Sequence, residues 1–132
     1  MKQVVAALIV RGDKILICQR TRHQPMPLKW EFPGGKIEPG EDARSALARE
    51  LLEELRIEAR IGALLHSETV QYPGSPAIRL QFYQVTDFSG EPLNLQFEEM
   101  VWEEPRNLPT YDFLEGDVEF VKKIANPIID GS

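Results

Sequence analysis

Three glutamates, Glu50, Glu53 and Glu54, lie close together in the segment RELLEEL, residues 49–55. In a helix, all three would fall within an arc of about 100°. Like charges at such spacings repel by roughly 0.2–0.5 kcal/mol per pair, and no basic residue stands three or four positions from Glu50. A divalent cation would remove this repulsion, because Mg²⁺ binds a few carboxylates together with waters and substrate phosphates. The spacing therefore indicates half of a metal site, with a solvated acidic helix face as the ordinary alternative.

The helix that carries these glutamates is predicted to span residues 42–55. Its other side is apolar, and the residues that form it are Ala48, Leu51, Leu52 and Leu55. An apolar stripe on one side of a helix normally packs on the core. We therefore expect leucines to hold the helix to the core and the glutamates to lie on a separate face.

A segment rich in glycine and proline, PGGKIEPGE, leads into this helix. Gly34 and Gly35 allow a sharp turn that brings bare backbone close to a ligand, and Pro39-Gly40 is typical of a second turn. Lys36 is followed by Ile37, and no G-x-G-x-x-G occurs. Neither common nucleotide-binding loop is therefore present.

The elements that must position these residues fit one small domain over residues 1–132. Two apolar runs around Gly12-Asp13 predict a hairpin of strands 3–11 and 14–20. Further strands are predicted in the segments 58–72, 77–88 and 99–104, and a closing helix at 116–125. Strands with two well-separated helices indicate an α/β or α+β fold.

Composition excludes several classes of protein. The net charge of −6 argues against stable nucleic-acid binding, which normally needs a surplus of Lys and Arg. The single cysteine, Cys18, has apolar neighbours and indicates a buried thiol in a reducing compartment, the cytoplasm. The apolar run VVAALIV is too short to span a bilayer, so no membrane association is expected.

The loop and helix together resemble a known family signature. Gly35, five residues, Glu41, seven residues and then RELLEELRI closely resemble the Nudix box over 23 residues at fixed spacing. The surrounding segments WEFPGGKIEPGE and ICQR are similar to the MutT-like branch of the Nudix hydrolases. The resemblance implies an α/β/α sandwich with a central mixed sheet. It also implies Mg²⁺- or Mn²⁺-dependent hydrolysis of a diphosphate linkage.

The same resemblance assigns roles within the box. The implied metal ligands are the carbonyl of Gly34 and the carboxylates of Glu50, Glu53 and Glu54. Glu50 or Glu53 is the candidate general base. Arg49 would orient a glutamate through a salt bridge, and Glu41 would act at the helix start or behind the metal ligands.

Two positions depart from the family pattern. Arg56 replaces the glycine near the end of the box, and a non-glycine residue in the left-handed conformation costs about 1 kcal/mol. A further carboxylate is expected in the loop before Trp102, but the aligned residue is Gln96. Glu98 is our prediction for the replacement ligand, with Glu99 and a purely surface acidic run as the alternatives.

Substrate contacts are assigned by the resemblance to four residues. Arg20 matches a phosphate- or sugar-contacting arginine, with an exposed strand-end arginine as the alternative. Phe32 would contact the base or fill the core, and Lys36 is assigned to the substrate as well. Glu115 stands where the MutT-like branch places an asparagine that reads guanine. A carboxylate there would accept from guanine N1–H and N2–H or from cytosine N4–H.

The leading interpretation is hydrolysis of a (d)NTP to (d)NMP and pyrophosphate, which would sanitise nucleotides such as 8-oxo-dGTP or modified dCTP. The alternatives are a Nudix hydrolase of ADP-ribose, a dinucleotide or capped RNA, and a non-catalytic Nudix-fold binding module. The box keeps every carboxylate, which disfavours the last. The expected partner is a nucleotide, and the chain is expected to be a monomer or homodimer.

Overall fold

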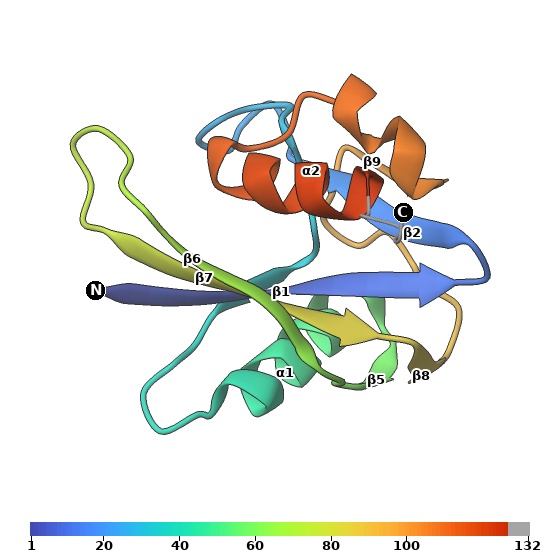
Figure 1. Cartoon of the computed structure of the whole chain (residues 1–132). Coiled ribbons are helices and arrows are strands. Elements are labelled where there is room, and N and C mark those ends of the chain that lie inside the picture. Colours follow the sequence, from blue (N-terminus) through green and yellow to red (C-terminus); the bar gives the residue numbers. More distant parts are fainter. Residues whose placement is uncertain (127–132) are drawn as a thin grey trace.

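A mixed seven-stranded sheet lies at the centre of the protein, and the computed structural model describes residues 1–126 (Figure 1). Its main strands follow the spatial order β3 (Trp30–Glu31), β2 (Lys14–Gln19), β1 (Lys2–Arg11), β7 (Ile78–Val85) and β6 (Leu64–Val70). Two short strands extend it: β4 (Gly34–Lys36) pairs with β1, and β9 (Glu99–Glu103) pairs with β2. A separate two-stranded sheet consists of β5 (Glu58–Arg60) and β8 (Asp87–Ser89).

Strand β1 organises the sheet. It runs parallel to β7 along most of its length. On its other edge it pairs antiparallel with β4 at residues 4–6 and with β2 at residues 10–11. Because side chains alternate across a strand, Val5, Ala7 and Ile9 enter one hydrophobic cluster, while Ala6 and Leu8 enter the other. This strand is apolar on both faces because both faces of the sheet are covered.

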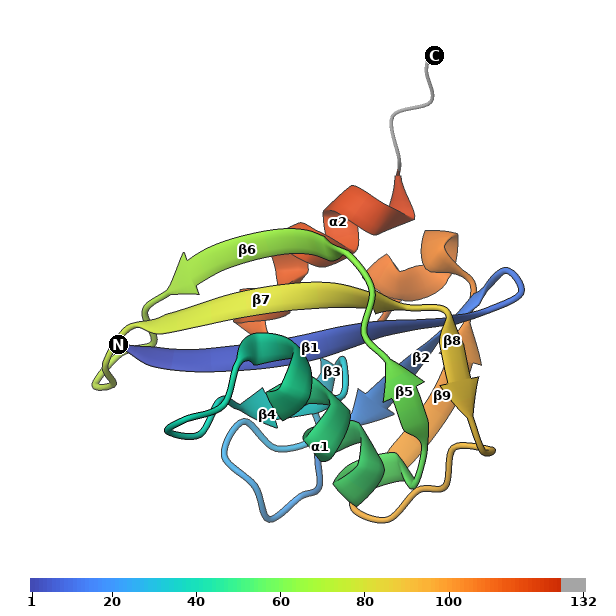
Figure 2. The same cartoon turned by 90° about the horizontal axis from the view of Figure 1, so that it is seen from below.

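Helices cover the two faces (Figures 1 and 2). Helix α1 (Ala43–Leu55) packs on the face that includes Val5 and Ile9. Helix α2 (Val118–Ala125) packs on the other face, beside two short 3-10 helices, η1 (Pro105–Thr110) and η2 (Glu115–Asp117). The α/β/α sandwich expected from the sequence is confirmed. None of the helices within residues 1–126 is long and apolar enough to cross a membrane.

The predicted hairpin at the N-terminus is confirmed, whereas two longer predicted strands are each divided. The segment 58–72 forms β5 and β6, and the segment 77–88 forms β7 and β8. Gly62 lies at the first break, where its N–H donates to the carbonyl of Gln84 at 2.8 Å. A side chain at Gly62 would begin 2.8 Å from that same oxygen, so the chain passes from the small sheet into the main sheet where only glycine fits.

Gly34 and Gly35 lie in strand β4, not in a turn as the sequence suggested. They pair with Ala6 and Val5 of β1. A Cβ on Gly34 would lie 2.0 Å from the carbonyl oxygen of Val5, and a Cβ on Gly35 would lie 2.4 Å from the Glu50 carboxylate. The glycines are therefore needed because β4 is pressed between β1 and α1.

Helix α1 begins at an Asp42 cap, where the Asp42 carboxylate accepts from the Ser45 N–H at 2.8 Å. Its buried residues are Ala46, Leu47, Leu51, Glu54 and Leu55. Leu52 is 47% exposed, whereas Glu54 is only 4% exposed. The predicted separation of a leucine face from a glutamate face is therefore wrong: the buried side includes Glu54.

The helix ends at Arg56 in the left-handed conformation, with φ of 60°. Its N–H donates to the carbonyl of Leu52 at 3.0 Å, which is the bond that a glycine at this position usually makes. The helix thus ends in the way that a glycine would allow, and the arginine occupies a strained backbone conformation.

Replacing Arg56 by glycine is expected to raise the free energy of unfolding by about 0.5–1 kcal/mol, because relief of strain exceeds the added entropy of the unfolded chain. The melting temperature should rise by about 2–4 °C. Arg60→Gly is the matched control, since Arg60 is an exposed strand residue. Equal destabilisation by both substitutions would contradict the strain at Arg56.

Candidate active site

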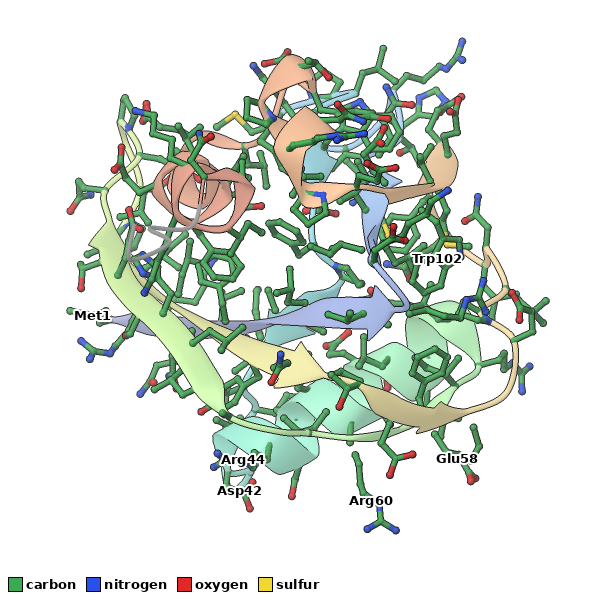
Figure 3. The ribbon with its side chains drawn as sticks, turned by 45° about the vertical axis from the view of Figure 1, so that its right-hand side comes forward. Met1, Asp42, Arg44, Glu58, Arg60 and Trp102 are labelled. Atoms are coloured by element: carbon green, nitrogen blue, oxygen red, sulfur yellow. The ribbon has the colours of Figure 1, made fainter. Side chains whose placement is uncertain are left out.

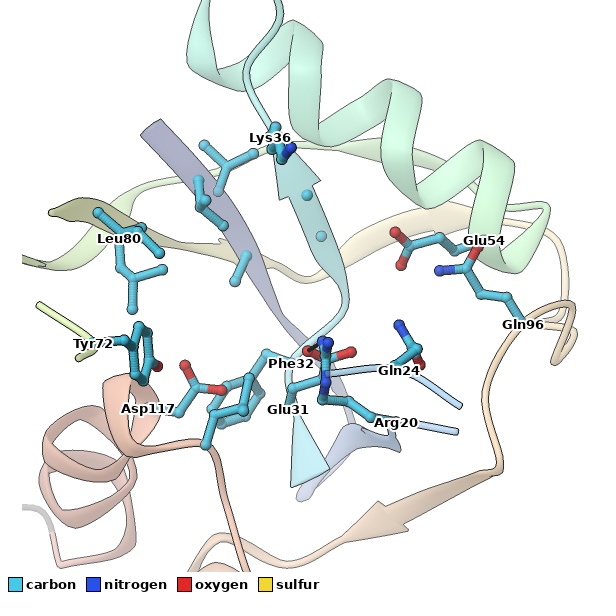
Figure 4. A pocket seen from close by; sticks show the side chains of 17 residues that line it. Arg20, Gln24, Glu31, Phe32, Lys36, Glu54, Tyr72, Leu80, Gln96 and Asp117 are labelled. Atoms are coloured by element: carbon cyan, nitrogen blue, oxygen red, sulfur yellow. Dashed lines mark hydrogen bonds and ion pairs between the residues drawn. The ribbon is translucent and has the colours of Figure 1, made fainter. Parts of the chain in front are cut away.

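A cavity of about 250 Å³ lies beside β4, between the C-terminal half of α1 and the turn before α2 (Figure 4). Its polar lining consists of Arg20, Gln24, Glu31, Lys36, Glu54, Tyr72, Gln96 and Asp117. Glu54 and Gln96 lie at one end, and Tyr72 and Asp117 lie at the other, with Arg20 and Glu31 between them (Figure 4).

Glu54 is a buried carboxyl group with one oxygen that forms no hydrogen bond to the described residues. Its Oε1 has no hydrogen-bond partner within the described part of the chain. Burial, together with the nearby Glu50 carboxylate, raises the pKa of Glu54 to about 9. Glu50 itself is largely buried, with 17% of its side chain exposed. Two carboxylates are therefore held close together where water cannot stabilise both charges.

Arg49 holds the neighbouring glutamates. Its guanidinium donates to Glu41 at 2.7 and 3.0 Å, to Glu50 at 3.1 Å and to Glu53 at 3.3 Å. It also donates to the carbonyl of Lys36 at 3.2 Å, which ties α1 to β4. The hydrogen bonds from Arg49 lower the pKa of Glu41 to about 2. Arg49 thus fixes Glu50, while no bond from Arg49 reaches Glu54.

The site fits a divalent cation through a small set of oxygen donors. Within residues 1–126, no group of three or more His, Cys, Asp or Glu side chains is arranged to hold a metal ion. The structure brings together Glu50 and Glu54, and Gly34 lines the same cavity. The orphaned Glu54 oxygen is the donor that a cation would satisfy. Mg²⁺ suits such a site because it usually completes its shell with waters and substrate phosphates.

Of the predicted ligands, Glu50, Glu53 and Glu98 do not line the cavity. Glu50 nevertheless contacts Glu54. The Glu53 side chain is 57% exposed and turns to Arg49. Glu98 pairs with Arg22 at 2.9 Å, which lowers the pKa of Glu98. Gln96 lines the cavity next to Glu54, so the amide occupies the place at which the family pattern led us to expect a carboxylate (Figure 4).

The middle and the opposite end of the cavity contain two acidic residues, Glu31 and Asp117, that the sequence did not single out. Asp117 is 6% exposed, and burial, with Glu31 adding to the effect, raises its pKa well above the usual range. Burial also raises the pKa of Glu31, partly opposed by Arg20. Arg20 donates to Glu31 at 3.0 Å and to the carbonyl of Pro25 at 2.8 Å. Arg20 is therefore a half-buried cavity residue rather than an exposed strand end.

The other predicted substrate residues have mixed positions. Phe32 is buried and stacks on Phe113 at 5.3 Å between ring centroids, so it fills the core and also lines the cavity. Lys36 lines the rim. Glu115 is exposed and lies outside the cavity lining, and Asp117, two residues later, lies inside it. Glu31 could have been found in the sequence because it is a single carboxylate between two aromatic residues, Trp30 and Phe32.

Similarity to known proteins extends over almost the whole described chain. A family model described as NUDIX domain matches residues 1–124. The chain belongs to this family. The CTP pyrophosphohydrolase of Escherichia coli is 38% identical over 92% of this chain and 90% of that protein. The 8-oxo-dGTP diphosphatase of Haemophilus influenzae is 34% identical over 92% of this chain and 90% of that protein.

A solved structure agrees with these relatives. The crystal structure of a MutT NUDIX hydrolase from Burkholderia pseudomallei superposes with a TM-score of 0.83 at 26% identity, covering 93% of this chain and 97% of that chain. The MutT-like resemblance and the assignment as a Nudix hydrolase are thereby confirmed. The residues of the Nudix box that the structure places in the cavity are Gly35, Lys36 and Glu54, and Gly34, just before the box, lines it as well.

The raised pKa of Glu54 predicts a pH-dependent stability in chelator-treated protein. The folded state keeps the Glu54 proton up to about pH 9, whereas the unfolded state loses it near pH 4.5. Stability contributed by this group is thus complete below about pH 4.5 and is lost as pH rises to about 9, by at most about 1.4 kcal/mol per pH unit. Urea unfolding from pH 5 to 8 should show this slope, and Glu54→Gln should remove it.

Glu53→Gln is the matched control for that measurement, because it removes an exposed carboxylate from the same helix. Its stability should keep the wild-type pH dependence. An unchanged slope in Glu54→Gln would show that Glu54 does not bind the proton in the folded state.

Proposed function

We propose that this Nudix hydrolase converts a nucleoside triphosphate into the monophosphate and pyrophosphate with Mg²⁺ or Mn²⁺. The observation that carries the proposal is a single cavity with Glu54, next to Glu50, at one end and hydrogen-bonding groups for a base at the other. The names of the relatives from E. coli and H. influenzae, a CTP pyrophosphohydrolase and an 8-oxo-dGTP diphosphatase, support a substrate of this class.

At the phosphate end, Glu50, Glu54 and the carbonyl of Gly34 would hold the cation. When bound, a divalent cation neutralises phosphate oxygens and lowers the pKa of a bound water. Lys36, at the rim of the same cavity, would bind a phosphate oxygen as a point charge. Arg49 would keep Glu50 in one orientation through its hydrogen bond at 3.1 Å.

The proton of the attacking water needs a carboxylate acceptor, and Glu50 and Glu53 are the candidates. Glu50 lies beside Glu54 but already accepts a hydrogen bond from Arg49 at 3.1 Å. Glu53 is 57% exposed and could turn toward the water. Glu98 would join the metal site only after release from Arg22.

At the base end, we propose that Asp117 takes the reading role that the sequence assigned to Glu115. A carboxyl group accepts hydrogen bonds from cytosine N4–H or from guanine N1–H and N2–H. Phe32 supplies an apolar surface beside it, and Arg20 keeps Glu31 partly neutralised. Modified nucleotides such as 8-oxo-dGTP or modified dCTP are the proposed targets, so the role is to sanitise the nucleotide pool.

The first test is a substrate screen with product identification. We expect a (d)NTP to give (d)NMP and pyrophosphate, and Glu50→Gln or Glu54→Gln to lower kcat about 10²–10⁴-fold, because each removes charge but little volume from the cation site. Glu58→Gln, an exposed glutamate on β5, is the control. Faster cleavage of ADP-ribose, a dinucleotide or capped RNA would contradict the proposed substrate, and wild-type rates in Glu54→Gln would contradict the metal site.

The second test compares the two acidic residues near the base end. Asp117→Asn should change the ratio of kcat/KM values among nucleotides by roughly tenfold or more, since a buried reader residue contributes about 1–3 kcal/mol to discrimination. Glu115→Gln should leave this ratio close to that of the wild type because Glu115 is exposed and outside the cavity. Steady-state kinetics on CTP, UTP, ATP and GTP provides the measurement. A larger change in Glu115→Gln would return the reading role to Glu115.

A further inference from the structure

Tyr72 lies in the connection between β6 and β7 and lines the cavity at its Asp117 end (Figure 4). Its side chain is half-buried, and nothing in its sequence context indicated a role. The hydroxyl oxygen accepts a hydrogen bond from the N–H of Gly116 at 3.0 Å. This bond links the β6–β7 connection to the residue immediately before Asp117.

The packing at Gly116 fixes where the hydroxyl lies. A Cβ on Gly116 would lie 2.9 Å from the Tyr72 hydroxyl and 2.8 Å from the Leu80 Cδ1 atom. Both contacts are too short for any residue with a side chain unless its neighbours move. Glycine at this position therefore allows the tyrosine oxygen to approach the backbone beside Asp117, and the hydrogen bond then holds it there.

The geometry leaves the hydroxyl proton for a ligand. A tyrosine hydroxyl has one hydrogen to donate and lone pairs that accept. Here a lone pair accepts from Gly116, and the hydroxyl donates to no group in residues 1–126. Figure 4 shows the hydroxyl on the same side of the cavity as the Asp117 carboxyl group. Burial raises the pKa of Tyr72, so the hydroxyl keeps its proton at neutral pH.

We propose that Tyr72 is a specificity-determining residue whose hydroxyl donates a hydrogen bond to the nucleobase. The hydroxyl would donate to a carbonyl oxygen or an unprotonated ring nitrogen of the base. This acceptor would lie next to the base N–H group that donates to Asp117. This inference rests on the proposed function of the cavity. Tyr72 would place a hydrogen-bond donor beside the acceptor Asp117. The cavity would then select a base that presents an acceptor next to an N–H group, and not every base that has an N–H group.

The test is Tyr72→Phe, which removes only the hydroxyl and keeps the ring. We measure kcat and KM for CTP, UTP, ATP, GTP and 8-oxo-dGTP with Mg²⁺. The kcat/KM for the preferred nucleotide should fall roughly 5- to 10-fold through a higher KM, as expected for loss of one hydrogen bond. The least preferred nucleotides should change less, so that the discrimination narrows while kcat stays near the wild-type value.

Tyr111→Phe is the matched control. The Tyr111 hydroxyl also makes one hydrogen bond, to Glu103 at 2.5 Å, but it lies outside the cavity lining. Removal of this hydroxyl should leave the ratios among the five nucleotides unchanged. Gly116→Ala is the second variant, because a methyl group there would displace the Tyr72 hydroxyl without altering it. It should narrow the discrimination in the same way as Tyr72→Phe.

The outcomes separate this inference from the proposed function. If the wild type hydrolyses nucleotides but Tyr72→Phe changes all five kcat/KM values equally, or none of them, the inference is wrong and the proposed function stands. If the wild type hydrolyses none of the five, both are wrong. Thermal melting accompanies each variant, and a narrowed ratio with an unchanged melting temperature supports the reading role.

Discussion

The close approach of β4 to helix α1 is the constraint on which the site depends. Glycine at positions 34 and 35 lets the strand lie against β1 on one side and against the Glu50 carboxylate on the other. Any side chain at either position would have to push the strand away from its neighbours. The separation of β4 and α1 therefore determines how deeply Glu50 and Glu54 are buried, and it leaves a Glu54 oxygen, without a partner in residues 1–126, that a cation would satisfy.

The close packing of β4 and α1 also brings several carboxylates together, and only some of them are paired with a positive charge. Arg49 neutralises the glutamates around it, with bonds to Glu41, Glu50 and Glu53. Glu54 receives none of these bonds, and one of its oxygens has no partner among the described residues. Strain and unmet polar groups of this kind concentrate at functional sites because structure elsewhere stabilises the fold. Here the stabilising structure is the doubly covered sheet, with its two hydrophobic clusters on opposite faces.

The sequence predicted the outline of the fold because its strongest patterns are local. Turns, helix caps and periodicity within short segments determine the hairpin around Gly12, the helix that follows Asp42 and the spacing of the Nudix box from Gly35. The predictions that failed depended on contacts between distant segments. Leu52 was placed in the core and Glu54 on an open face because a helical wheel does not show which side β4 will cover. The division of the segment 58–72 coincides with the approach of Gly62 to Gln84, which no local pattern indicates.

The part of the cavity proposed to bind the base contains residues that the sequence did not predict at all. Asp117, Glu31 and Tyr72 come from three separate parts of the chain, and only the fold brings them to one cavity. The distribution of charge along the cavity also bears on how a protein with a net charge of −6 could bind an anionic substrate. Arg20 is already paired with Glu31, so the cavity itself has little free positive charge beyond Lys36 at the rim. A triphosphate would therefore depend on a cation at Glu50 and Glu54 for most of its attraction, while the hydrogen-bonding groups at the other end select the base. Attraction and selection are thus separated along one cavity.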